Sequence, residues 1–187
     1  MGKIFDLAKA LAGEKSLHGS FGRWIQAVSR ALDDGAATPD YGIVKKGPAL
    51  ATVGVNDTLP LEVEGPMRGV TYQGYSWILT PGKTYLLQAD GWFNNFSNPA
   101  TGLLDVAWVD DNNTYLQAPT MDSPSARFRP VTSTDPNSSG GGGLSMIYTV
   151  PSGDVNLRIA KLRVMGAAGT ADMLSGSWTS TVLEIPG

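Results

Sequence analysis

Catalysis near neutral pH usually needs a titratable or nucleophilic side chain, and His18 is the single histidine of this 187-residue chain. A serine–histidine pair would have to use His18 as its base, yet no Gly-x-Ser-x-Gly motif supplies the serine. The chain has no cysteine, which excludes disulfides and zinc sites built from several Cys or His ligands. We expect His18 to face solvent or to cap a helix.

Carboxylates form two close pairs in the sequence. Asp110 and Asp111 could bind calcium, but their spacing matches no EF-hand loop and a hairpin turn also explains them. Glu62 and Glu64 lie two residues apart, which places both on one face of a strand. The acid and base of a glycosidase usually come from separate segments, so we expect these two glutamates to form a solvated face.

Aromatic residues beside an asparagine-rich segment offer binding rather than catalysis. Trp92, Phe93 and Phe96 could stack on a sugar ring if they are exposed. The net charge of -3 and the pI of about 5.0 give no basic field for nucleic acid or anionic lipid. No apolar run approaches the roughly 20 residues of a spanning helix. We therefore expect no enzyme activity, no cofactor, no metal, and neither nucleic acid nor membrane as a partner.

The elements that would position these residues are patterned most clearly from Ser76 to Gln117. Leu104, Val106 and Trp108 alternate with smaller or polar residues, the two-residue period of a strand with one buried face. Residues 110–113 are turn formers, so residues 114–116 should return antiparallel. Pro81-Gly82 is a β-turn pair that separates two further short strands.

Other strands are predicted before this stretch. We expect them at 50–55, at 59–63 before a turn at Gly65-Pro66, and at an edge over 70–75. Short connections indicate antiparallel pairing, because parallel strands need long crossovers. A charged fraction of 17% and 23 glycines suit a β-protein with many turns. The sequence therefore predicts a mainly β, antiparallel sandwich or barrel.

Residues 118–143 form the least regular part of the chain. A loop this long is usually functional or mobile. It could be a surface excursion between two strands, or a contact loop against a neighbouring subunit with Arg127, Phe128 and Arg129 as its interface residues. The run Gly140–Gly143 at its end lacks the lysine and the following helix of a phosphate-binding loop.

Strand patterns resume at Leu144. Apolar alternation predicts strands at 144–150 and 155–164, with a bulge or break near Ala160-Lys161. Residues 166–176 are mostly small and predict a loop.

The last strand, 177–185, has apolar residues on both faces. Trp178 and Val182 share one face, and Leu183 and Ile185 share the other. Such a strand is expected to be covered on both sides, by its own core and by helices or another molecule. We therefore expect trimer contacts from Tyr148, Trp178 and Val182.

Residues 1–35 differ in kind, because their apolar residues recur at helical spacing. Two amphipathic helices are predicted, the second ending at Gly35. They could cover one end of their own sandwich or form an arm that anchors the protein to a partner; mixed charges on the polar faces disfavour a membrane-surface helix. The domain plan is an arm at 1–35, a linker at 36–47 and a sandwich at 48–187. The anchor candidates are Ile4, Phe5, Leu7, Leu11, Phe21, Trp24, Ile25 and Val28.

Three stretches carry a resemblance to known proteins: Pro81–Ala89, Gly102–Asn113 and Gly176–Ile185. In the order of their strands and the composition of their turns they resemble the tumour-necrosis-factor-like jelly-roll domains of tailed-phage virion proteins. The resemblance covers residues 48–187 and implies an antiparallel jelly-roll β-sandwich in a homotrimer, with residues 1–35 as a helical attachment arm. It implies no catalytic residues.

The resemblance also implies where such a protein acts. It would be made in the host cytoplasm and become part of the virion, as a capsid decoration (cement) protein that binds the major capsid protein or another virion protein. The alternative is a receptor-binding head- or tail-fibre tip that recognises a cell-surface glycan. A carbohydrate-active enzyme is the third reading.

Overall fold

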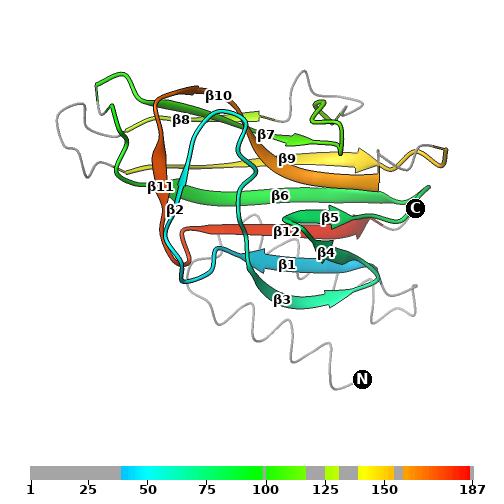
Figure 1. Ribbon diagram of the computed structural model, residues 1–187. Helices are drawn as coiled ribbons and strands as arrows, with labels where there is room; N and C mark the ends of the chain where they lie inside the picture. The colour runs from blue at the N-terminus through cyan, green and yellow to red at the C-terminus, as the bar shows by residue number, and fades with distance from the viewer. Residues whose placement is uncertain (1–38, 99, 117–124, 131–138, 154–157, 186–187) are drawn as a thin grey trace. The chain divides into compact units, whose positions relative to one another are not determined.

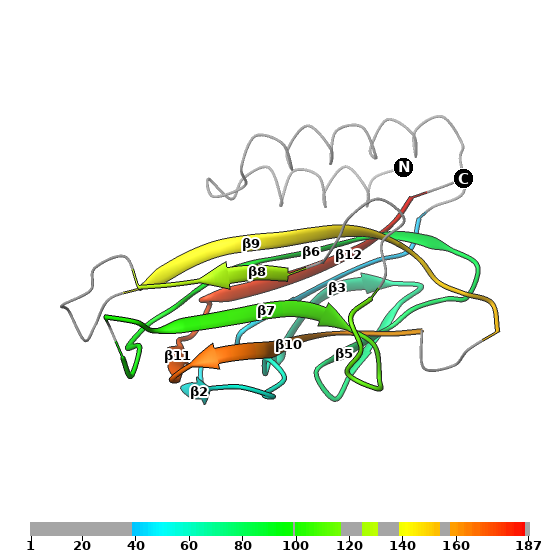
Figure 2. The ribbon, with the colours of Figure 1, turned by 90° about the horizontal axis from the view of Figure 1, so that it is seen from above.

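The computed structural model describes residues 39–98, 100–116, 125–130, 139–153 and 158–185, which all belong to the compact unit Pro39–Gly187. These residues form two stacked five-stranded sheets, seen nearly edge-on in Figure 2. All their strand pairings are antiparallel. The prediction of a mainly β, antiparallel sandwich is confirmed.

Figure 1 shows the strands, which we group as sheet I, sheet II and a small two-stranded sheet. Sheet I has the order β3 (Val63–Arg68), β1 (Tyr41–Lys45), β12 (Trp178–Ile185), β6 (Thr84–Phe93) and β9 (Gly140–Thr149). Sheet II has the order β4 (Thr71–Gln73), β5 (Ser76–Ile78), β10 (Ile159–Ala168), β7 (Leu103–Val109) and β8 (Ser125–Phe128). The third sheet pairs β11 (Ala171–Met173) with β2 (Ala51–Val53).

The core lies between sheets I and II, and an aromatic cluster joins them. The ring centroid of Trp178 lies 5.0 Å from those of both Phe93 and Phe128. Gly91 pairs with Trp178, and a side chain at Gly91 would run into the indole, so the glycine leaves room for the ring. Elsewhere in the core, the indole N–H of Trp77 donates to Ser180 Oγ at 2.9 Å and links β5 to β12.

The strand predicted around Leu104 is β7, and its alternation is confirmed: Leu104, Val106 and Trp108 are all fully buried. Its return turn is confirmed as well. Asn113 has a positive φ of 63°, and Tyr115 pairs antiparallel with Val109. Turn residues with short polar side chains tolerate this left-handed conformation, which is why the composition of 110–113 predicts the turn.

The predicted turn at Gly65-Pro66 is wrong, because both residues lie inside β3. The register between β1 and β3 shifts at this point, which marks a bulge. Proline is tolerated here since β3 is an edge strand of sheet I. The predicted linker 36–47 is also wrong in part: it contains β1, which pairs with β3 on one side and with β12 on the other.

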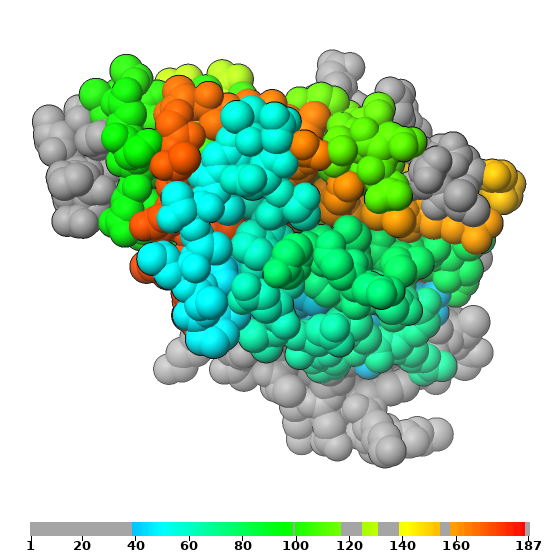
Figure 3. Space-filling model, in the orientation of Figure 1, coloured from blue at the N-terminus to red at the C-terminus, as the bar shows by residue number. Residues whose placement is uncertain are grey.

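The predicted strand 59–63 is replaced by a segment that runs beside β10 without forming a regular strand. The amide of Leu59 donates to Leu162 at 2.9 Å, and that of Asn56 donates to Val164 at 2.8 Å. In the space-filling view of Figure 3 this cyan segment lies against the orange of β10. It therefore extends sheet II where β5 has ended.

The chain between Ala118 and Gly176 contains more strand than its composition predicts. β8 lies inside the segment predicted as a long loop, and β9 begins at Gly140, so the glycine run is a strand. β11 lies inside the predicted loop 166–176. The irregularity of β10 falls between Val164 and Gly166 and not at Ala160-Lys161. Residues 154–157 of the predicted strand 155–164 lie outside the described residues.

Candidate functional site

Asp110 and Asp111 serve the hairpin. Oδ1 of Asp110 accepts the amide of Thr114 at 2.8 Å, and the carbonyl of Asp110 accepts the amide of Asn113 at 3.1 Å. Asp111 Oδ1 lies 3.7 Å from Nζ of Lys161. The described residues hold no group of three or more His, Cys, Asp or Glu placed to bind a metal ion. The hairpin interpretation of the Asp pair therefore stands.

Glu62 belongs to a structural ion pair. Its Oε2 lies 2.9 Å from Nζ of Lys46, whose side chain is completely buried. The same ammonium donates to the carbonyl of Ala49 at 2.6 Å. A buried ammonium needs such partners, because desolvation without them is costly. Glu62 and Glu64 are both exposed, as expected, but Glu62 lies before β3 and its carboxylate also pairs with Lys46.

The aromatic group beside the asparagine-rich segment divides between the core and the surface. Phe93 and Phe96 are buried, whereas Trp92 is 44% exposed. Trp92 and Phe93 are neighbours on β6, so they point to opposite faces of sheet I. The three rings therefore cannot form one sugar platform, and Trp92 alone is available.

The residues predicted to contact other subunits are mostly in the core. Tyr148, Trp178 and Val182 are 3%, 0% and 0% exposed, and all three lie in the cluster between the sheets. Their apolar character is explained by the sandwich itself. The prediction chose the wrong face of the last strand. Trp178 and Val182 face the core, and Leu183 and Ile185 lie on the outer face of β12.

The predicted contact residues Arg127, Phe128 and Arg129 also separate. Phe128 is buried in the aromatic cluster. The guanidinium of Arg127 donates to both carboxylate oxygens of Asp105, at 2.8 and 3.2 Å, on the outer face of sheet II. Arg129 is exposed. Only the two arginines are therefore placed to meet another molecule.

The anchor candidates and His18 lie outside the described residues, so the helical arm stays a prediction. The anchor candidates are Ile4, Phe5, Leu7, Leu11, Phe21, Trp24, Ile25 and Val28. Among the residues that the structure describes, no helix is long and apolar enough to cross a membrane.

The outer face of sheet I carries a row of apolar side chains that sequence reasoning missed. Tyr41 pairs with Leu183, Leu183 with Leu86, and Leu86 with Ile147. Directly paired residues point to the same face, and their neighbours Val182, Leu87 and Met146 fill the core. These four side chains, which we call the apolar row, therefore cross four strands of sheet I on its outer side. Ile147, at the β9 end, is 50% exposed.

The rows on both sides of the apolar row are uncharged. One contains Ile185, Thr84 and Thr149, with the two threonine hydroxyls 2.9 Å apart. The other contains Ile43, Thr181, Gln88 and Ser145. At about 4.8 Å between strands, the apolar row is roughly 14 Å long. From β1 to β9 the centre of this face is thus free of charge, and Arg68 of β3 pairs with Tyr41 at its edge. An outward face of an antiparallel sheet normally carries polar side chains.

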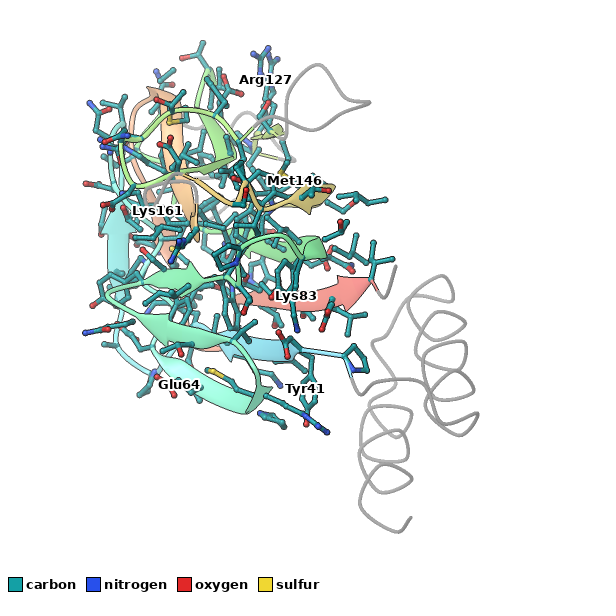
Figure 4. The ribbon with its side chains drawn as sticks, turned by 90° about the vertical axis from the view of Figure 1, so that its right-hand side faces the viewer. Tyr41, Glu64, Lys83, Arg127, Met146 and Lys161 are labelled. Atoms are coloured by element: carbon teal, nitrogen blue, oxygen red, sulfur yellow. The ribbon has the colours of Figure 1, made fainter. Side chains whose placement is uncertain are left out.

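The outer face of sheet II is different. Lys161 and Arg163 on β10 point outward, as does Arg127 on β8, which pairs with Asp105. Figure 4 looks along the sandwich and shows Lys161 and Tyr41 on its opposite sides. The two outer faces therefore differ in chemistry: one is charged, and the other is apolar at its centre.

Lys83, just before β6, joins Asp40, near the start of the described chain, to Glu184 in β12. Its ammonium lies 2.7 Å from Asp40 Oδ2 and 3.0 Å from Glu184 Oε2. The hydrogen bond to Asp40 is the largest cause that raises the pKa of Lys83 above its usual value. Tyr85 donates to Asp40 at 3.2 Å, and burial raises the pKa of Tyr85. The cluster ties the residue before β1 to β6 and β12, which is a structural role.

Comparison with known proteins identifies the fold. No protein-family model and no curated protein sequence matches the chain. The structure of Eiger TNF from S. frugiperda is similar over 79% of this chain and 94% of that chain, with a TM-score of 0.52 and 9% sequence identity. The fold is a TNF-like jelly roll. Murine APRIL, solved at pH 5.0, covers 79% of this chain and 99% of its own at 12% identity, with a TM-score of 0.47.

At these identities the likeness concerns the fold alone. It confirms the jelly roll that the resemblance implies for the described residues. The virion location, the capsid partner and the oligomeric state remain predictions, and the TNF-like jelly roll says nothing of them.

Proposed function

We propose that this TNF-like jelly roll is a non-enzymatic structural protein of a phage virion, a homotrimer that decorates and stabilises the capsid. The observation that carries the self-association is the charge-free outer face of sheet I with its apolar row. Interface centres are depleted of charged residues. In a trimer the contact is heterologous, so this face would pack against a different surface of the neighbouring subunit.

The structural role is supported by the ion pairs among the described residues, which join strands and turns. Lys46 pairs with Glu62, Lys83 with Asp40 and Glu184, and Arg127 with Asp105. Each of these clusters ties strands or turns together. A decoration protein needs a stable assembly and a capsid-facing surface, and this use of polar groups suits that role.

The capsid-binding part of the proposal rests on the sequence pattern of residues 1–35. Isolated helices of about three turns are marginal in water, so an amphipathic arm gains stability by burying its apolar stripe. Burial of three or four large side chains contributes about 1.5–3 kcal/mol each, and this favourable term offsets the cost of association. The largest of these side chains are Phe21, Trp24 and Ile25.

Sedimentation of the full-length chain tests the assembly. We expect a trimer at micromolar concentration for the wild type, and a monomer for Ile147→Asp, because the new carboxylate enters the charge-free face. Ile78→Asp is the matched control: Ile78 is 38% exposed on β5 of sheet II, and its change should leave the trimer intact. A monomeric wild type would contradict the proposal.

Co-sedimentation with undecorated phage capsids tests the attachment. The fragment 36–187 should keep its thermal melting transition and its assembly, yet no longer pellet with capsids. In the full chain, Trp24→Ser should weaken pelleting while Tyr115→Ser, at a 40% exposed aromatic of the jelly roll, should not. Unchanged capsid binding by the fragment, together with a large drop in its melting temperature, would mean that the arm only covers its own sandwich.

A further inference from the structure

Trp92 is a large apolar side chain left at the surface of an otherwise well-packed sandwich. It is 44% exposed and lies on the outer face of sheet I, near the end of β6. Leu86 of the apolar row is six residues away on the same strand, about 20 Å at 3.3 Å per residue. Trp92 therefore does not belong to the apolar row, and what matters is the surroundings of its ring.

The strand beside Trp92 is a run of glycines, and the structure explains three of them by close approach. A side chain at Gly140 would run into the carbonyl of Arg129, and one at Gly143 would run into the carboxylate of Asp90. At Gly142 a Cβ would lie 3.2 Å from the ring of Phe128, a tight contact. Backbone therefore excludes a side chain at Gly140, whereas at Gly143 the exposed Asp90 side chain and at Gly142 the ring of Phe128 would have to shift.

Gly141 is the exception. It pairs directly with Trp92, and a Cβ there would lie 3.6 Å from the Cβ of Trp92, an ordinary contact. Packing therefore does not require glycine at this position. Because Gly141 has no side chain, the β9 side of the Trp92 indole is left uncovered.

Polar side chains precede Trp92 on the same face of β6. Asp90 precedes Trp92 by two residues, and its carboxylate leans toward β9, since it occupies the place of a side chain at Gly143. The Nε2 amide of Gln88 donates to Asp90 Oδ2 at 2.9 Å. Both residues belong to the outer face, and a carboxylate retains acceptor capacity beyond one such bond.

We propose that Trp92 and Asp90 bind one neutral hexopyranose unit of a glycan, with Gln88 orienting the Asp90 carboxylate and Gly141 leaving one side of the indole open. The C–H groups on one face of a pyranose ring pack on an indole, and a few placed polar groups then fix the hydroxyls at its edge. Asp90 accepts hydroxyl hydrogen bonds and repels anionic sugars, which selects a neutral unit. The site does not depend on the virion role of the protein.

A single sugar on an open platform binds weakly, in the millimolar range, so the assay must detect fast exchange. The probes are methyl α-D-glucopyranoside, methyl α-D-mannopyranoside and methyl β-D-galactopyranoside, each added to the full chain. Saturation-transfer NMR, with irradiation of protein methyl groups, reports contact with sugar ring protons. We expect transfer to at least one of the three sugars; transfer to none overturns the proposal.

Variants locate the contact. Trp92→Ala and Gly141→Thr should each weaken binding by about tenfold or more, the first by removing the platform and the second by filling the space beside it. Trp92→Phe should retain part of the sugar binding. Tyr115→Ala removes an exposed aromatic ring elsewhere and should leave sugar binding unchanged. Undiminished transfer in both Trp92→Ala and Gly141→Thr overturns the site.

Two controls keep the result decisive. Far-ultraviolet circular dichroism checks folding, and if Trp92→Ala fails to fold, Gly141→Thr decides because its Cβ has room. Sedimentation of both variants separates the sugar site from a subunit contact. If Trp92→Ala dissociates the assembly while Gly141→Thr still binds sugar, Trp92 belongs to a protein interface and the proposal fails.

Discussion

Replacing Trp178 by alanine measures how much the aromatic cluster contributes to the free energy of unfolding. Trp178 is 0% exposed, and its ring lies 5.0 Å from those of Phe93 and Phe128. Truncation of a buried tryptophan costs about 3–5 kcal/mol, from lost transfer free energy and from the cavity left behind. Its indole N–H has no hydrogen-bond partner among the described residues. Truncation therefore removes an unpaired donor, and we expect the lower end, about 3 kcal/mol.

Urea unfolding at one fixed protein concentration provides the assay, since assembly would make the midpoint concentration-dependent. A loss of about 3 kcal/mol corresponds to a melting temperature lower by about 6–12 °C for a chain of this length. Trp92→Ala is the matched control, because Trp92 on the same sheet is 44% exposed and its truncation should cost less, about 1 kcal/mol. Equal losses for the two tryptophans would refute the placement of Trp178 in the core.

A double-mutant cycle with Gly91 sharpens the same test. A side chain at Gly91 would run into the indole of Trp178, so Gly91→Ala should destabilise the wild type. In the Trp178→Ala background the indole is gone and only the carbonyl oxygen of Ser177, 2.6 Å from that Cβ, still obstructs it, so Gly91→Ala should cost less than in the wild type. If Gly91→Ala costs the same in both backgrounds, the two residues do not touch.

Three further predictions follow from polar contacts in the described residues. Ser180→Ala leaves the indole N–H of Trp77 without its acceptor at 2.9 Å, so urea unfolding should show a loss of about 1–3 kcal/mol. Burial raises the pKa of Tyr72 and of Tyr85, and the hydrogen bond to Asp40 raises the pKa of Lys83. The unfolded chain then loses these protons first, so stability should be full below about pH 10 and fall above it. Tyr85→Phe and Lys83→Met should each flatten that decline in urea midpoints. Glu62→Gln should lower the melting temperature more than the pair Lys46→Met with Glu62→Gln, because the single change leaves the buried ammonium without its carboxylate.

The strands that sequence predicts well are those with one buried face and a recognisable turn. β7 is the clearest case: alternation at Leu104, Val106 and Trp108 and a run of turn formers after it specify strand and turn together. The last strand is equally clear, and its two apolar faces are found where the alternation places them. In both cases local residues contain the whole signal.

The missed elements depend on partners that are distant in sequence. β1 is short, with glycine at its second position, and it is a strand because β3 and β12 lie beside it. The glycine run of β9 has no strand propensity, yet Asp90, Phe128 and Arg129 fill the spaces where its side chains would be. Gly65-Pro66 favours a turn in isolation and becomes a bulge at an edge strand. Tertiary pairing overrides local preference at all three.

The apolar row could not be predicted from the sequence, because it is formed by the pairing of strands that are distant in the chain. Its residues come from β1, β6, β9 and β12 and differ in exposure: Ile147 is 50% exposed, Tyr41 and Leu86 are half-buried, and Leu183 is 5% exposed. Single apolar residues at a surface need no explanation, whereas a contiguous patch does. Only the register of four strands aligns them, and the same register keeps charge out of the rows on both sides. A charge placed at Ile147 therefore tests a property of the whole sheet, while the same charge at Ile78 tests only one strand.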